Sequence, residues 1–129
     1  MAYVDIVTVL AVLQFILFGF HVGRARGRFG VKAPATTGNE IFERFFRIQQ
    51  NTLELLVGFI PGIYLFGRYF SPLWAAALGV IYLVGRQIYA AAYVLDPGKR
   101  SLGYGLSFLP VAVLLIGGLI GAVWRLIHG

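Results

Sequence analysis

Two hydrophobic segments of the chain carry polar and charged side chains at helical spacing. Offsets of three and four residues place each set on one face of a helix. An ionised side chain inside a membrane segment costs about 3 kcal/mol unless it pairs or meets a polar ligand. A chain that accepts this cost repeatedly is expected to bind something polar on these faces. The first face holds Arg44, Arg47, Asn51 and Glu54, and the second holds Tyr82, Arg86, Tyr89 and Tyr93.

Arginines on and near these faces outnumber the acidic groups. Guanidinium groups bind carboxylates in a bidentate geometry, so the excess of positive charge could neutralise an anionic ligand. Tyr89 and Tyr93 share a face with Arg86, and their hydroxyls can donate to a carboxylate or a thiolate in the same cleft. The arginines counted here are Arg26, Arg44, Arg47, Arg86 and Arg100, against the single acidic residue Glu54.

Each polar group also has a plain structural explanation. Arg44 follows Glu43 at the mouth of its segment and could snorkel to lipid phosphates, so an anchoring role and a binding role both stay open. Arg47 or Arg86 could form an internal salt bridge with Glu54. The tyrosines could belong to an interfacial aromatic belt. A salt bridge would leave the surplus of arginines unexplained.

Composition places the chain in a membrane. Of its 129 residues, 59% are hydrophobic and only 12% are charged, and the mean hydropathy is +0.81. In soluble domains about a quarter of the residues are charged. Four segments reach the length of about 20 residues that a bilayer core requires. The sequence therefore predicts an all-α integral membrane protein, one domain over residues 1–129, built as a bundle of four transmembrane helices at residues 4–22, 42–66, 73–95 and 106–126.

Basic residues mark the sidedness of the predicted bundle. They gather after the first and third segments, so the positive-inside bias predicts that the connections 23–41 and 96–105 are cytoplasmic. The net charge of +6 is explained by this topology, and nucleic-acid binding is not predicted. No cleaved signal or organelle address is evident, which favours a bacterial inner membrane over the endoplasmic reticulum.

Few residues are available for metal or thiol chemistry. The chain contains no cysteine, so a thiolate metal site or a cysteine nucleophile is excluded. His21 and His128 lack the neighbours that a metal site needs, and no metal is predicted. Any thiol chemistry must use a thiol that the substrate supplies.

Short polar motifs mark where the predicted helices begin and end. Thr37 or Asn39 can cap the second helix, and Ser71 with the following proline can start the third. The run Asp96-Pro97-Gly98 ends the third helix.

The run from Phe42 to Glu54, Phe-Glu-Arg-Phe-Phe-Arg-Ile-Gln-Gln-Asn-Thr-Leu-Glu, resembles the signature of the MAPEG superfamily, the membrane-associated proteins in eicosanoid and glutathione metabolism. The Pro-Ala-Thr-Thr-Gly run at residues 34–38 and the block at residues 85–101 are most similar to microsomal glutathione transferase types two and three and to leukotriene-C synthase. The resemblance covers essentially the whole chain.

This resemblance implies a homotrimer that binds glutathione at the interfaces between subunits, open to the cytoplasmic side. It further implies that Arg100 stabilises the glutathione thiolate. Arg26 and Gln49 are expected to reach in from the neighbouring subunit. The remaining glutathione contacts that the resemblance implies are Arg47, Asn51, Glu54, Arg86, Tyr89 and Tyr93.

The predicted activity is that of a glutathione transferase that conjugates lipophilic electrophiles, with reduction of lipid hydroperoxides as a second activity. Arg26 is followed by Gly27 where leukotriene-C synthase has paired arginines, so leukotriene formation is not predicted. Two alternatives stay open. One is a non-catalytic membrane protein that binds lipid or glutathione, and the other is a small multidrug exporter, for which Glu54 among arginines is poorly suited.

Overall fold

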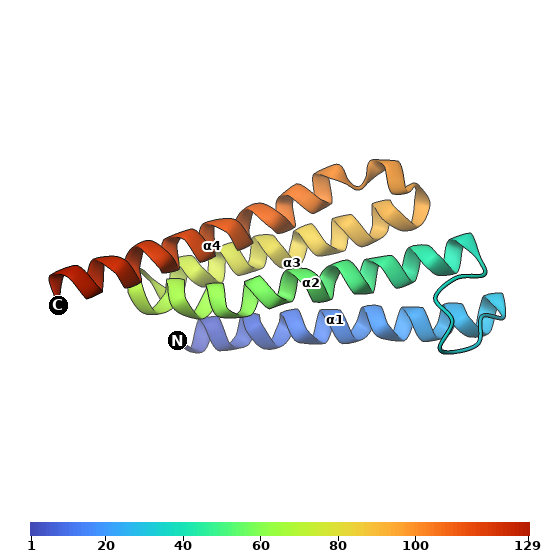
Figure 1. The fold of residues 1–129 in the computed structure, drawn as a ribbon, viewed down its shortest axis with the longest axis horizontal. Helices are drawn as coiled ribbons and strands as arrows, with labels where there is room; N and C mark the ends of the chain where they lie inside the picture. The colour runs from blue at the N-terminus through green and yellow to red at the C-terminus, as the bar shows by residue number, and fades with distance from the viewer.

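The computed structural model describes residues 1–129 as four long helices that lie side by side along their length (Figure 1). Both termini lie at one end of the bundle, and the α1–α2 and α3–α4 connections lie at the other. This confirms the predicted all-α, four-helix architecture. The helices are α1 (Ala2–Phe29), α2 (Glu40–Tyr69), α3 (Pro72–Leu95) and α4 (Ser101–His128), with a short 3-10 helix, η1 (Pro97–Lys99), before α4.

All four helices extend beyond their predicted membrane segments, and α1 and α4 extend the furthest. α1 continues to Phe29 and ends at Gly30, whose φ of 68° is left-handed. Arg24, Arg26 and Arg28 therefore lie on the helix rather than in the connection. Likewise, α4 begins at residue 101 instead of 106. The predictions followed the apolar runs, whereas helical hydrogen bonding continues beyond the apolar core.

The predicted capping residues are observed at three helix ends. Asn39 Oδ1 accepts a hydrogen bond from the Phe42 backbone nitrogen at 3.0 Å, so Asn39 rather than Thr37 begins α2. Ser71 Oγ accepts from the backbone nitrogen of Trp74 at 3.3 Å, at the start of α3. Asp96 ends α3, and these three ends agree with the sequence to within a residue.

α2 and α3 form the centre of the bundle, since each of them packs against both α1 and α4. Their shared core contains Phe59, Ile63, Tyr82 and Leu114, all fully buried. The Tyr82 and Phe59 rings stack with centroids 4.1 Å apart. Tyr82 thus packs in the core on the same face of α3 as Arg86, and its hydroxyl is buried without a hydrogen-bond partner.

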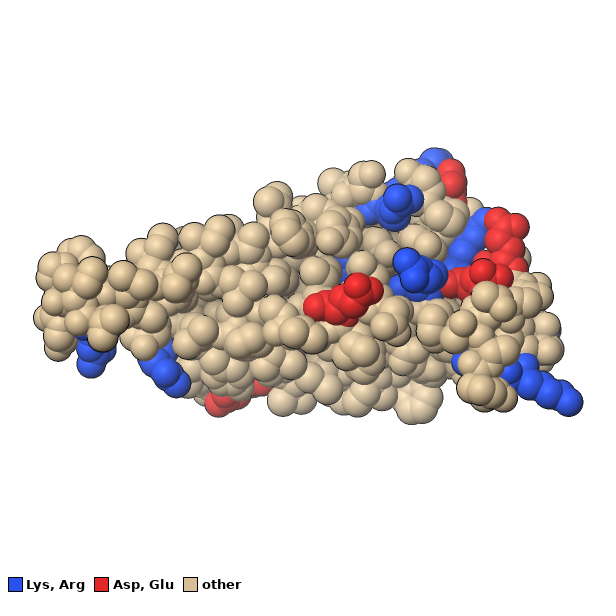
Figure 2. Space-filling view, viewed as in Figure 1, with Lys and Arg blue, Asp and Glu red and all other residues tan.

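Three of the helices, α1, α3 and α4, are long and apolar enough to cross a membrane. α2 is as long, but its polar face lowers its hydropathy. Large apolar side chains point outward, such as Trp74 at 68% exposed and Leu126 at 84% exposed. Figure 2 shows that most of the charged side chains in view gather toward the end with the two connections, with only a few along the middle and at the opposite end. Such a surface suits lipid or another apolar partner.

α3 and α4 approach most closely where glycines face the partner helix. A Cβ at Gly85 would lie 2.7 Å from the backbone nitrogen of Ser107, and a Cβ at Gly103 would overlap the backbone of Tyr89. Both positions therefore require a residue without a side chain.

We expect Gly103→Ala to lower the thermal unfolding midpoint of the detergent-solubilised protein, because overpacking of this kind costs about 1–3 kcal/mol. Gly105→Ala is the matched control on the same helix, since its Cβ would meet no atom within 4 Å. Equal unfolding midpoints for the two variants would contradict the close approach of α3 and α4.

Candidate functional site

The polar residues of the bundle converge on Arg86, which is 0% exposed in the middle of α3. Its Nε donates to Ser107 Oγ at 2.9 Å, and its Nη1 donates to Asn51 Oδ1 at 2.7 Å and to Thr52 Oγ1 at 3.2 Å. The guanidinium lies 4.3 Å from the centroid of the Tyr89 ring. We call these five residues the Arg86 cluster. One guanidinium connects α2, α3 and α4.

Every hydrogen-bond acceptor of Arg86 is neutral. The chain has one ion pair, in which Arg44 Nη2 lies 3.1 Å from Glu40 Oε1. The alternative of an internal salt bridge between Glu54 and either Arg47 or Arg86 is therefore not observed. Arg86 Nη2 is buried without a partner, so the cluster keeps one unused donor.

Beside the Arg86 cluster, one face of α2 presents opposite charges that are exposed and unpaired. Arg47 and Glu54 are both exposed and lie on either side of the half-buried Asn51. Neither charged group takes part in the chain's single ion pair. A seven-residue separation places them about 10 Å apart along the helix axis. The open face can receive a ligand that carries both a carboxylate and an amine.

Tyrosine rings extend the site from the cluster toward the start of α4. Tyr89 is buried, and its ring lies 5.5 Å from that of Tyr93 and 6.3 Å from that of Tyr104. Arg100 precedes α4, and its carbonyl accepts from the Tyr104 backbone nitrogen at 3.0 Å. Arg100 Nη1 donates to the Pro97 carbonyl at 2.9 Å, and the side chain is otherwise exposed. Arg100 thus lies one helical turn before Tyr104, whose ring is tilted against that of Tyr89.

Arg26 and Gln49 lie on the other side of α2, toward α1. Arg26 Nη1 donates to the Ala35 carbonyl at 2.7 Å, and its guanidinium lies 4.9 Å from the centroid of the Phe42 ring. The Gln49 amide packs against Gly19 of α1. A single chain does not bring these two residues to the Arg86 cluster, and their contribution to a neighbouring subunit's site stays a prediction.

Arg44 has a structural role that neither explanation from the sequence anticipated. Its Nη1 donates to the backbone carbonyls of Val94 at 2.9 Å and Leu95 at 3.3 Å. These carbonyls belong to the last turn of α3, where helical partners are missing. Arg44 therefore joins α2 to the end of α3.

Three members of the site were missed in the sequence, namely Thr52, Ser107 and Tyr104. Thr52 follows Asn51 directly, and its hydroxyl also bonds the Ile48 carbonyl at 2.8 Å. Ser107 is a small polar residue within an apolar helix, which is a signal for a hydrogen bond between helices. Tyr104 offers no such signal, because its position against Tyr89 depends on how α3 and α4 pack.

We expect Ser107→Ala to lower the free energy of unfolding by about 1–3 kcal/mol, because Arg86 Nε would lose its acceptor in a buried place. Denaturation in mixed detergent micelles measures this quantity. Ser101→Ala, at an exposed position of the same helix, is the control and should be nearly neutral. Stability of Ser107→Ala equal to that of the control would show that the cluster does not hold the helices together.

Comparisons with known proteins identify the family to which the chain belongs. The family model described as MAPEG family matches residues 4–120. The chain is 45% identical to the Synechocystis sp. protein called "Uncharacterized protein sll1147", over 94% of this chain and 88% of that protein. It is 38% identical to microsomal glutathione S-transferase 2 of Homo sapiens, over 89% of this chain and 78% of that protein. It is 36% identical to leukotriene C4 synthase of Bos taurus, over 73% of this chain and 63% of that protein. The chain is a multi-pass membrane protein that belongs to the MAPEG family.

Proposed function

We propose that the protein is a membrane-bound glutathione transferase that activates glutathione as a thiolate and conjugates it to lipophilic electrophiles. The observation that carries this proposal is the open face of α2, where Arg47 and Glu54 stay unpaired beside the Arg86 cluster. The relatives named microsomal glutathione S-transferase 2 and leukotriene C4 synthase support glutathione as the co-substrate.

Glutathione matches the charges of this face. At neutral pH it carries two carboxylates and one ammonium group. Arg47 binds a carboxylate, and Glu54 accepts from the ammonium group. An extended tripeptide spans about 10 Å, which is the separation of Arg47 and Glu54 along α2. Asn51 lies between them and can bond the peptide backbone while it holds Arg86.

Arg100 is the catalytic residue in this proposal. A thiol with a pKa of about 8.5 is mostly protonated at neutral pH, and a guanidinium within hydrogen-bonding reach lowers that pKa. Arg100 Nη1 donates to the Pro97 carbonyl, which orients the side chain. The other guanidinium nitrogens can still donate to the glutathione sulfur. Tyr93 and Tyr89 are further donors beside it. The thiolate then attacks an apolar electrophile that arrives from the bilayer, with the sulfur–carbon bond formed as the leaving group departs or the ring opens.

A second subunit completes the site in this proposal. The α2 face is open in one chain, whereas Arg26 and Gln49 lie on the opposite side of α2. In a closed ring of three subunits, one face of each subunit meets a different face of the next. Glutathione would then lie between the Arg47 face of one subunit and the Arg26 side of its neighbour.

We expect Arg100→Ala to retain glutathione binding and to lose the thiolate, because the guanidinium acts on the sulfur rather than on the carboxylates. Ultraviolet difference absorbance of the detergent-purified protein measures the thiolate, and equilibrium dialysis measures binding. Lys99→Ala removes a neighbouring exposed charge and is the control. An Arg100→Ala variant with undiminished thiolate absorbance and turnover would remove Arg100 from the mechanism.

Arg47→Ala is expected to weaken glutathione binding about 10- to 100-fold, since a charge-assisted hydrogen bond contributes about 1.5–3 kcal/mol. Equilibrium dialysis with labelled glutathione measures the change. Arg68→Ala, at the other end of α2, removes the same charge and should leave binding unchanged. Unaltered affinity in Arg47→Ala would mean that Arg47 does not contact the ligand.

A further inference from the structure

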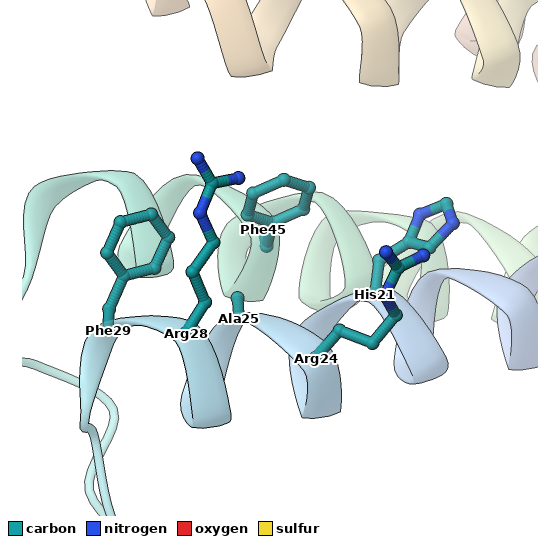
Figure 3. A pocket seen from close by; sticks show the side chains of 6 residues that line it. All are labelled: His21, Arg24, Ala25, Arg28, Phe29 and Phe45. Carbon is teal, nitrogen blue, oxygen red and sulfur yellow. The ribbon is translucent and has the colours of Figure 1, made fainter.

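A cavity of about 320 Å³ lies between α1 and α2, away from the Arg86 cluster and near the end of α1 (Figure 3). Figure 3 shows His21, Arg24 and Arg28 extending from the same side of α1, with Phe45 of α2 beside them. Ala25 and Phe29 complete the lining. Two guanidinium groups and an imidazole thus share one cavity.

No acidic side chain lines this cavity. The single ion pair of the chain, between Arg44 and Glu40, involves none of its residues. Arg28 lies 5.2 Å from the centroid of the Phe29 ring, and the His21 ring lies 6.4 Å from that of Phe45. The cavity therefore combines uncompensated positive charge with aromatic walls, which is suited to an anion attached to an apolar body.

The same side of α1 continues into an apolar groove. A second cavity, of about 500 Å³, lies between α1 and α3, and its α1 lining consists of Leu10, Leu13, Gln14 and Leu17. These positions and the cationic ones recur at offsets of three and four residues, so they share one helix face. A small cavity that shares His21 and Phe45 with the cationic one reaches Phe18 on α1 and extends to α3.

The length of this surface matches one leaflet of a membrane. From His21 to Leu10 the helix rises about 16 Å, close to half of the hydrocarbon thickness of about 30 Å. The cationic cavity lies just beyond the apolar run of α1, where the headgroups of that leaflet are expected. Leu13 and Leu17 are about half exposed, at 53% and 46%, so an acyl chain can contact them.

We propose that this face of α1 binds an anionic phospholipid, with the phosphate at His21, Arg24 and Arg28 and an acyl chain along Leu13 and Leu17. The site is separate from the proposed glutathione face on α2 beside the Arg86 cluster. Arg26, which that proposal assigns to a neighbouring subunit's site, is two residues from both Arg24 and Arg28 and so points to another side of α1. It gives the protein a preference for anionic lipid that does not depend on catalysis.

Native mass spectrometry of the detergent-purified protein tests this proposal, with phosphatidylglycerol and phosphatidylcholine of identical acyl chains as probes. The wild type is expected to retain phosphatidylglycerol preferentially. Arg24→Gln/Arg28→Gln should weaken that binding about thirtyfold and leave phosphatidylcholine unchanged. Lys32→Gln/Lys99→Gln removes the same charge at the same end of the bundle and should bind as the wild type does.

A second arm distinguishes a lipid from a free anion. Leu13→Ala/Leu17→Ala should weaken phosphatidylglycerol binding, and inorganic phosphate at equal concentration should fail to displace the lipid. Displacement by phosphate alone would overturn the lipid assignment in favour of a free-anion site. If the wild type retains phosphatidylglycerol and phosphatidylcholine equally, the proposed lipid preference is overturned. If Lys32→Gln/Lys99→Gln loses as much phosphatidylglycerol binding as the arginine variant, the binding depends on general surface charge, and the proposed site is overturned as well. A changed assembly mass in the arginine pair would identify this face as a contact between copies and would also overturn the proposal.

Discussion

Burial of Arg86 is the constraint on which the rest of the bundle depends. A guanidinium without water is costly unless its donors are satisfied. Asn51 and Thr52 from α2 and Ser107 from α4 supply three acceptors to a side chain of α3. The hydrogen bonds therefore fix the register of three helices at once. Close approach of α3 and α4 at Gly85 and Gly103 brings Ser107 within reach.

The neutrality of these acceptors decides what the neighbouring charges can do. Had Arg86 paired with Glu54, the chain would have used its one acidic group on that face internally. Instead Asn51 accepts a hydrogen bond from the Arg86 guanidinium, and Glu54 and Arg47 stay exposed on either side of Asn51 along α2. Arg44, by contrast, is engaged in structure, because it donates to the backbone carbonyls at the end of α3. The structure thus separates the arginines that hold the fold from those free to bind a ligand.

Much of the fold could be predicted from the sequence because its signals are local. Apolar runs defined four helices, and Asn39, Ser71 and Asp96 marked helix ends through their own hydrogen bonds. The far end of α1 was placed too early because its last turns are polar, although their backbone remains helical. The site was only partly predictable, since periodicity places Asn51 and Arg86 on helix faces but cannot give the register between helices. Ser107 and Tyr104 enter the site through that register.

We propose that the unpaired Glu54 carboxylate accepts from the ammonium group of glutathione. Calorimetric titration of the wild type and of Glu54→Gln with glutathione and with N-acetylglutathione tests this assignment. We predict that acetylation weakens binding to the wild type about 10- to 100-fold, as expected for one charge-assisted hydrogen bond, and has little further effect in Glu54→Gln. Equal weakening in both proteins would show that the amine is bound elsewhere and would contradict the assignment of this face.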